Sequence, residues 1–340
     1  MIHIDGKTGE GGGQVLRASL ALSLATGKPF VIEDIRGGRK KPGLLRQHYT
    51  AVKAAAEIST AETSDVAIGA SRLEFRPNAV RGGEYQFSVG SAGSASLVMQ
   101  AILPPLLLAD EPSTIEFEGG THNPMAPPLD FIEKTLFPRL ATMGASLSLT
   151  VDRFGFYPAG GGRFTLKVEP VVRHEPLELM DRAESVTLNA VAYVSQIPER
   201  IGERELHVLT ESLPLPLEST EVVNVPNAVG PGNALVVAIS DGSATEVVTG
   251  FGEKGTSAER VAKKVVNDVR RFLKAEAPVG AHLADQLIVL MALGAGGRFR
   301  TLPPSRHLKT VIEITQQFLD AEISLTPTDG IAWEVVVNPA

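Results

Sequence analysis

Cysteine is absent from this chain of 340 residues, which excludes disulfides, thiolate-bound metals and a cysteine nucleophile. Long hydrophobic runs are absent too: the longest, such as residues 101–109, contain prolines and are too short to span a bilayer. The first residues lack a basic segment followed by an apolar stretch, which is the pattern of a secretory signal. We therefore expect a cytoplasmic protein with no membrane contact.

Positive charge is also limited, since 32 lysines and arginines face 39 acidic residues and the net charge is −7. A protein that coats nucleic acid through many phosphate contacts needs a broad basic face, which this composition does not supply. Any contact with nucleic acid should therefore be local. The one dense basic stretch runs from Arg36 to Gly43 with Arg46 nearby, and its glycines suit either a solvated loop or an anion-binding loop.

The residues that are present describe a repeated globular protein. Apolar residues make up 43% of the chain and charged residues 21%, as in ordinary soluble proteins. The length exceeds the usual size of one domain, and a helix, strand, loop, helix pattern occurs three times. The copies begin with helices at residues 13–25, 93–109 and 282–293, continue through strands at 29–35, 113–118 and 298–302, and end with helices at 43–58, 128–143 and 307–319.

The spacing of the copies predicts an insertion between the second and the third. The equivalent loops begin at Arg36, Gly119 and Pro303, about 83 and then about 184 residues apart, which leaves an excess of roughly 100 residues. An excess of that size is typical of a domain inserted in a loop. We expect a smaller inserted α/β domain at residues 183–276, and a large domain of three repeats at residues 1–182 and 277–340.

The expected fold class is α+β. Hairpin-like pairs, such as residues 72–76 with 85–89, favour mixed or antiparallel sheets with helices packed on one face, repeated around a common centre. A doubly wound parallel sheet is not expected, because the glycine-rich stretches at residues 9–14 and 90–94 do not match a dinucleotide fingerprint. Neither stretch is followed by the Gly-Lys-Ser/Thr of a nucleotide-hydrolase phosphate loop.

His307 is the strongest candidate for a catalytic residue. It follows Pro303 and Pro304, which keep the backbone extended, and it lies at the start of a helical pattern. The positive end of the helix dipole opposes protonation of the imidazole and attracts phosphate. A nucleophilic histidine beside an anion site predicts a covalent phosphoryl or nucleotidyl intermediate. The alternative is a capping or packed histidine.

Polar residues gather near the helix starts of the first two copies. Glu10, Gln14 and Arg17 accompany a glycine-rich helix start, which can bind phosphate through backbone amides. Gln100 lies further along the helix of the second copy. The glycines could serve tight packing instead, and Arg17 could pair with Glu10.

The third copy begins with polar residues in an otherwise apolar helix. Asp285 and Gln286 interrupt this helix, so their polar groups need partners or a ligand. Asp285 could bind a ribose, an adenine amino group or a metal, or it could cap the adjacent loops. His282 is a rival nucleophile, but it lacks the rigid pair of prolines that precedes His307.

Several long motifs follow one another along nearly the whole chain. They lie at residues 5–6, 10–17, 36–47, 90–94, 119–124, 157–162, 282–287 and 304–307. In sequence and in order they resemble the RNA 3′-terminal phosphate cyclase family. The resemblance implies three repeated α+β units with a smaller inserted domain, in agreement with the count of repeats.

The resemblance also implies a reaction in three steps. His307 would attack the α-phosphate of ATP, release pyrophosphate and hold AMP as a phosphoramidate, with magnesium or manganese neutralising charge. AMP would pass to an RNA 3′-phosphate end. The neighbouring 2′-hydroxyl would then displace AMP and close a 2′,3′-cyclic phosphate, since it is already positioned beside the activated phosphate.

Further site residues come from the resemblance alone. His307 matches the adenylated histidine, Gln100 a nucleotide contact, and Glu10 the metal surroundings. The chain departs from close relatives at His282, where they have a tyrosine, so an imidazole would replace the aromatic platform for the base. The remaining nucleotide and phosphate contacts that the resemblance implies are Leu283, Ala284, Asp285, Gln286, Pro127, Pro128, Arg17, Arg39 and Gln47.

Two other functions remain open at this point. A non-catalytic branch of the family acts in ribosome assembly, and such a protein would be an RNA-binding scaffold; that branch lacks the histidine found here at His307. A small-molecule transferase is the second alternative, because enolpyruvyl transferases share a similar repeated unit. They lack the Pro-Ser-x-His and His-Leu-Ala-Asp-Gln motifs.

Overall fold

Three four-stranded sheets in this computed structural model, which describes residues 1–339, share one topology. Their strand orders, β1-β2-β4-β3, β5-β6-β8-β7 and β9-β14-β16-β15, are equivalent. In each sheet the first two strands pair in parallel, and the other neighbours pair antiparallel. Each unit therefore runs strand, helix, strand, helix and two final strands, and the fold is α+β.

The first two units follow one another along the chain. The first consists of β1 (Ile2–Asp5), α1 (Gly13–Thr26), β2 (Phe30–Glu33), α2 (Arg46–Ser59), β3 (Glu62–Thr63) and β4 (Leu73–Arg76). The second consists of β5 (Gly83–Ser88), α3 (Ala95–Leu107), β6 (Ser113–Gly119), α4 (Leu129–Phe131), the π-helix η1 (Ile132–Leu136), α5 (Phe137–Thr142), β7 (Ser146–Arg153) and β8 (Gly162–Glu169).

The third unit is interrupted. It begins with β9 (Leu177–Leu179) and resumes with α8 (Ala281–Leu293), β14 (Gly297–Thr301), α9 (Arg306–Phe318), β15 (Glu322–Pro327) and β16 (Trp333–Asn338). The predicted copies begin at their first helices, and the extra residues lie between the second and the third of these. In the structure the third unit begins earlier, with the short strand β9, which pairs with β14 across the extra residues.

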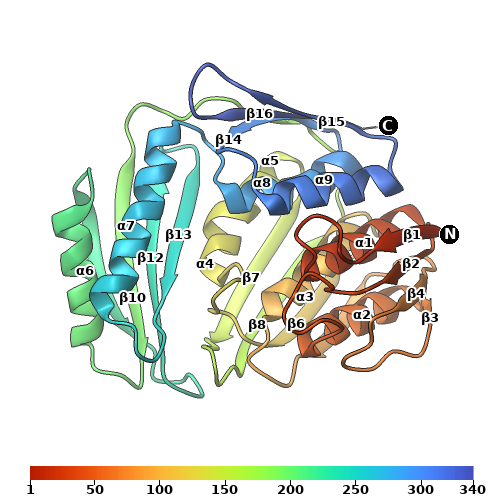
Figure 1. Ribbon diagram of the computed structural model, residues 1–340, viewed down its shortest axis with the longest axis horizontal. Helices are drawn as coiled ribbons and strands as arrows, with labels where there is room; N and C mark the ends of the chain where they lie inside the picture. The colour runs from red at the N-terminus through yellow and green to blue at the C-terminus, as the bar shows by residue number, and fades with distance from the viewer. Residues whose placement is uncertain (340) are drawn as a thin grey trace.

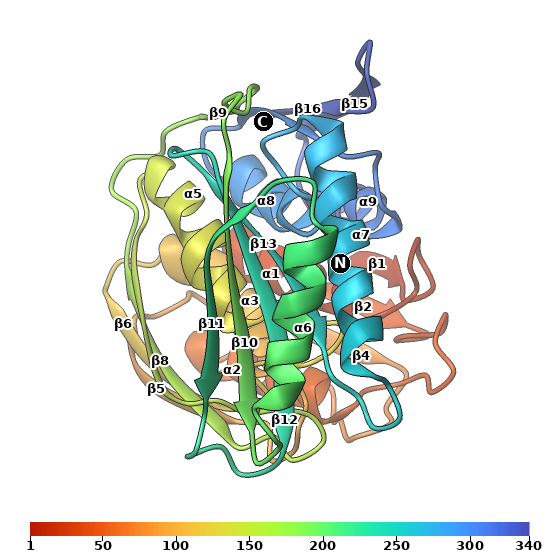
Figure 2. The same cartoon turned by 90° about the vertical axis from the view of Figure 1, so that its left-hand side faces the viewer.

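The interrupting segment forms a fourth sheet, which we call the β10–α7 unit. It consists of β10 (Thr187–Ser195), α6 (Arg200–Ser212), β11 (Leu217–Asn224), β12 (Gly232–Ser240), β13 (Thr245–Phe251) and α7 (Ala258–Ala275). Its helices cover one face of its sheet, and it lies beside the three repeats (Figures 1 and 2). Its apolar residues form a core of their own. The domain boundaries at residues 182/183 and 276/277 remain a prediction.

The helices of the three repeats pack together at the centre, with the sheets outside them (Figure 1). Helices α1, α3 and α8 are apolar around most of their circumference, which is the pattern of a helix buried on all sides. Strands β6 and β8 alternate buried and more exposed residues, so each presents one face to this core. No helix within residues 1–339 has the length and hydrophobicity needed to cross a bilayer.

The expected pairing of residues 72–76 with 85–89 was wrong. Strand β4 pairs with β2 on one side and β3 on the other, so it has no free edge. Strand β5 instead pairs in parallel with β6. The two strands thus belong to different repeats.

Phe164→Ala tests the packing of the core beneath the second sheet. Phe164 is fully buried on β8 and stacks on Phe117, with ring centroids 5.0 Å apart. The change should lower the free energy of unfolding by about 3–5 kcal/mol, because it removes apolar contacts and leaves a cavity. Urea denaturation measures this, with the exposed Val172→Ala as the control, expected within about 0.5 kcal/mol of wild type. A loss below about 1 kcal/mol for Phe164→Ala would contradict the packing described.

Candidate active site

An open cavity lies between the helices of the three repeats. Its walls bring together four predicted site residues, Arg17, Gln100, Asp285 and Gln286, on α1, α3 and α8. Cavities that are mostly apolar, with a few convergent polar groups, are typical of small-molecule sites. The remaining lining residues are Gln14, Ala18, Ala21, Leu103, Pro104, Leu136, Val289, Leu290 and Val311.

Arg17 and Asp285 both line this cavity, and the charge of each affects the pKa of the other. Burial lowers the pKa of Arg17 to about 10, against the opposing effect of Asp285. Burial raises the pKa of Asp285 to about 7, although Arg17 acts to lower it. Arg17 thus stays charged near neutral pH, while Asp285 changes its protonation there. The pair provides a cation for an anionic ligand and a carboxyl that can accept or donate a hydrogen bond.

Amide side chains complete the polar wall. Gln100 donates through Nε2 to Oε1 of Gln286 at 2.7 Å, and Gln286 donates to the backbone carbonyl of His282 at 3.1 Å. This chain connects α3 to the first turn of α8. Desolvation by the surrounding protein atoms lowers the pKa of His282, and the positive charge of a protonated His307 nearby lowers it further.

His307 lies at the start of α9, and a hydrogen bond ties it to the first repeat. Its Nδ1 is 2.8 Å from Oε1 of Gln14, at the start of α1 and in the cavity wall. Ser305 caps α9 by accepting the backbone N–H of Leu308 at 3.0 Å. An amide oxygen accepts, so Nδ1 carries the proton in this arrangement. The lone pair of the neutral ring is therefore on Nε2.

Burial and two arginines favour the neutral form of His307. Burial lowers its pKa first, followed by the positive charges of Arg17 and Arg39. The direction agrees with the expectation of a neutral imidazole, but these groups, not the helix dipole alone, account for it. A neutral ring is what a nitrogen nucleophile requires.

Glu10 is the residue predicted to lie by a metal. Its side chain is 4% exposed, pairs with Arg39 and accepts the backbone N–H of Gln14 at 3.3 Å. Within residues 1–339, no three His, Asp or Glu side chains lie together as a metal-binding group. One carboxylate fits an ion of the magnesium type that takes its other ligands from substrate phosphates and water. A single carboxylate does not fit a metal site in which the protein supplies all the ligands.

His48 is a residue that the sequence analysis missed. It is buried on α2, and a Cβ at Gly13 would collide with its Nε2 and lie 2.9 Å from Nη1 of Arg17. Burial, then Arg17 and Arg36, lower its pKa to about 3. Its Nδ1 accepts the N–H of Leu45 at 3.3 Å, so Nε2 carries a proton beside Arg17. A histidine directly after Gln47, at the end of the glycine-rich basic stretch, is the signal that could have indicated it.

Five other predicted residues do not line the cavity. Leu283 and Ala284 are buried in the core beneath α8. Gln47 accepts the backbone N–H of Ser94 at 2.9 Å, which holds the glycine-rich start of α3. The carbonyl of Pro127 accepts from Ser96 at 2.8 Å, and Pro128 precedes the first residue of α4.

The tautomer of His307 can be measured. Nitrogen-15 NMR at pH 7.5 should show a protonated Nδ1 and an unprotonated Nε2, because Gln14 accepts from Nδ1. Gln14→Leu should remove this preference, since leucine offers no acceptor. The exposed His207 on α6 serves as the internal reference. A wild-type signal for protonated Nε2 on His307 would contradict the assignment.

Comparison with known proteins covers nearly the whole chain. A family model described as RNA 3′-terminal phosphate cyclase matches residues 8–325. A relative from Koribacter versatilis (strain Ellin345) named RNA 3′-terminal phosphate cyclase is 47% identical over 332 residues, which cover 98% of this chain and 94% of the relative. The solved structure of the enolpyruvyl transferase NikO from Streptomyces tendae matches with a TM-score of 0.41 and 9% identity. The match covers 98% of this chain and 47% of that chain. A likeness this weak supports no conclusion about the present protein. The chain belongs to the RNA 3′-terminal phosphate cyclase family.

Proposed function

We propose that this protein converts RNA 3′-phosphate ends to 2′,3′-cyclic phosphates, with ATP as the activating substrate and a histidine-bound AMP as the intermediate. The family model and the relative named above support the overall reaction. The covalent route rests on one observation: Gln14 accepts from Nδ1 of His307 at the rim of a cavity that also contains Arg17 and Asp285.

In the first step, Nε2 of His307 attacks the α-phosphorus of ATP. A nitrogen–phosphorus bond forms, the bond from the α-phosphorus to the bridging oxygen breaks, and pyrophosphate leaves. Gln14 holds the proton on Nδ1 and so keeps the Nε2 lone pair available. Arg17 supplies positive charge for the phosphates, and Gln100, Asp285 and Gln286 supply polar contacts for the rest of the nucleotide.

In the next two steps the activated group moves to RNA and is released. An oxygen of the RNA 3′-phosphate attacks the phosphorus of the histidine-bound AMP, and the bond to Nε2 breaks. The neighbouring 2′-hydroxyl then attacks the RNA phosphate, loses its proton and displaces AMP. Protonated Nε2 of His48, beside Arg17, is a suitable donor to the RNA phosphate.

A divalent metal fits this scheme as a partner of the phosphates. Glu10 would be its protein ligand, with phosphate oxygens and water as the others. When bound, such an ion neutralises phosphate charge. Arg39, which pairs with Glu10, would remain beside the same phosphates.

Labelling with α-labelled ATP and magnesium tests the proposal. Wild type should acquire an acid-labile, alkali-stable label, and His307→Ala should acquire none, because it lacks the attacking nitrogen. Gln14→Leu should slow labelling about tenfold or more, since the wrong tautomer of a catalytic histidine is costly. Addition of a 3′-phosphorylated RNA should then release AMP and yield a cyclic end, measured by resistance to phosphatase.

His282→Ala distinguishes the two histidines, because His282 lies near His307 but no hydrogen bond within residues 1–339 orients its ring for attack. The variant loses the expected contact with the base, so labelling should need more ATP. It should still acquire the label. Label that persists in His307→Ala and disappears in His282→Ala would reverse the assignment. Absence of label from wild type would contradict the covalent route and favour an RNA-binding scaffold.

A further inference from the structure

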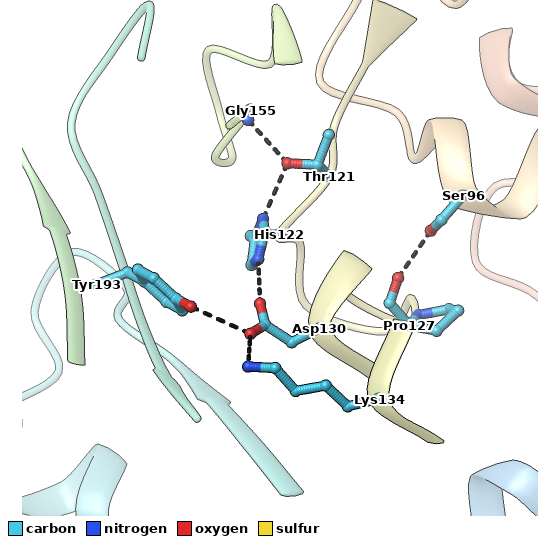
Figure 3. A network of polar contacts seen from close by, with 8 residues as sticks. All are labelled: Ser96, Thr121, His122, Pro127, Asp130, Lys134, Gly155 and Tyr193. Atoms are coloured by element: carbon cyan, nitrogen blue, oxygen red, sulfur yellow. Dashed lines mark hydrogen bonds and ion pairs between the residues drawn. The ribbon is translucent and has the colours of Figure 1, made fainter. Parts of the chain in front are cut away.

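A buried polar network connects the β10–α7 unit to the second repeat (Figure 3). Its centre is Asp130 on α4, whose side chain is 7% exposed. Oδ1 accepts from Lys134 at 2.8 Å and from the hydroxyl of Tyr193, on β10, at 3.1 Å. Oδ2 lies 3.0 Å from Nε2 of His122. Burial alone would raise the pKa of Asp130, but the hydrogen bonds and charges of His122 and Lys134 outweigh it, so the pKa lies below its usual range.

The hydrogen-bond network continues on the far side of His122. The backbone N–H of Gly155 donates to Oγ1 of Thr121 at 2.9 Å, and Oγ1 lies 2.9 Å from Nδ1 of His122. The carboxylate of Asp130 only accepts, so His122 donates to it from Nε2, while Thr121 holds the other ring nitrogen. The ring of His122 also stacks on Phe154, with centroids 4.2 Å apart. Every member is satisfied by a neighbour, and such a network fixes one geometry.

This network lies next to one wall of the cavity between the three repeats. We take that cavity as the ATP site and call it the nucleotide cavity. Helix α4, which carries Asp130, is followed directly by η1, and the last residue of η1, Leu136, lines the cavity. Strand β13 of the β10–α7 unit packs against both α4 and η1. π-Helical turns are rare in proteins, and those that occur are often found at functional sites. Tyr193 therefore fixes, through Asp130, the helical segment that ends at the cavity-lining residue Leu136.

The β10–α7 unit also contacts the opposite wall. Glu246 on β13 is buried, and its Oε2 accepts the backbone N–H of Gly280 at 3.3 Å. Gly280 is the residue before α8, the helix that carries His282, Asp285 and Gln286. A Cβ at position 280 would displace the Glu246 carboxylate from its present position. Glu246 therefore acts as a cap that the neighbouring unit provides for α8.

We propose that the β10–α7 unit positions both walls of the nucleotide cavity, with Tyr193 and Glu246 as the positioning residues. Tyr193 fixes η1 through Asp130, and Glu246 fixes the start of α8. Neither side chain lines the cavity, so each acts through the helix that it holds. The inference rests on the proposed function, because it takes this cavity as the ATP site.

The test measures ATP affinity separately from the later chemistry. Tyr193→Phe removes only the hydroxyl, whereas Glu246→Leu removes the acceptor and Glu246→Gln retains one. Tyr193→Phe and Glu246→Leu should each raise the KM for ATP in labelling of His307 about tenfold, the effect of one hydrogen bond to a charged or buried group. Glu246→Gln should stay near wild type. Transfer of AMP from the labelled protein to RNA should be unchanged in all three.

Asn227→Ala is the matched control, because Asn227 of the same unit donates to the backbone carbonyl of Asp152 at 3.2 Å and touches neither wall. It should leave the KM for ATP unchanged.

The same variants in a His307→Ala background, with the Kd of ATP from equilibrium dialysis, give a readout that needs no covalent step. Unchanged KM and Kd in both Tyr193→Phe and Glu246→Leu would overturn the positioning role alone. A loss in AMP transfer to RNA as large as the loss in labelling would overturn it too. So would a raised KM for ATP in Asn227→Ala. Failure of wild type to acquire label, with ATP binding that still responds to the variants, would overturn only the covalent route.

Discussion

The hydrogen bond between Gln14 and Nδ1 of His307 is the constraint on which the site depends. It joins residues 293 positions apart, at the starts of α1 and α9, and so requires the first and third repeats to pack in one register. It also decides which ring nitrogen has a free lone pair. The same contact therefore connects the fold to the chemistry.

The repeated architecture explains why this contact can form. Helices α1, α3 and α8 are apolar enough to pack together at the centre, and their few polar residues are left to face a shared cavity. Buried charges are costly, and the opposite charges of Arg17 and Asp285, on two repeats, offset part of that cost for each other. The apolar core and the polar site are two consequences of the same helix packing.

The sequence predicts much of this because periodicity and glycine-rich loops are local properties. The helices at His307 and His282 begin within one residue of their predicted starts, and the polar residues Arg17, Gln100, Asp285 and Gln286 do line one cavity. The orienting role of Gln14 and the location of His48 depend on contacts between repeats, which spacing along the chain does not reveal. The short strand β9 was missed for the same reason, since its partner β14 lies beyond the β10–α7 unit. The resemblance supplied Pro127, Pro128, Leu283 and Ala284 as nucleotide contacts, but none of them lines the cavity described here.

The central claim is that Gln14 selects Nε2 of His307 as the reacting nitrogen. A crystal structure of the protein after incubation with ATP and magnesium tests it most directly. The account predicts phosphorus bonded to Nε2 of His307, with Nδ1 still donating to Gln14. Phosphorus on Nδ1, or on His282, would contradict it.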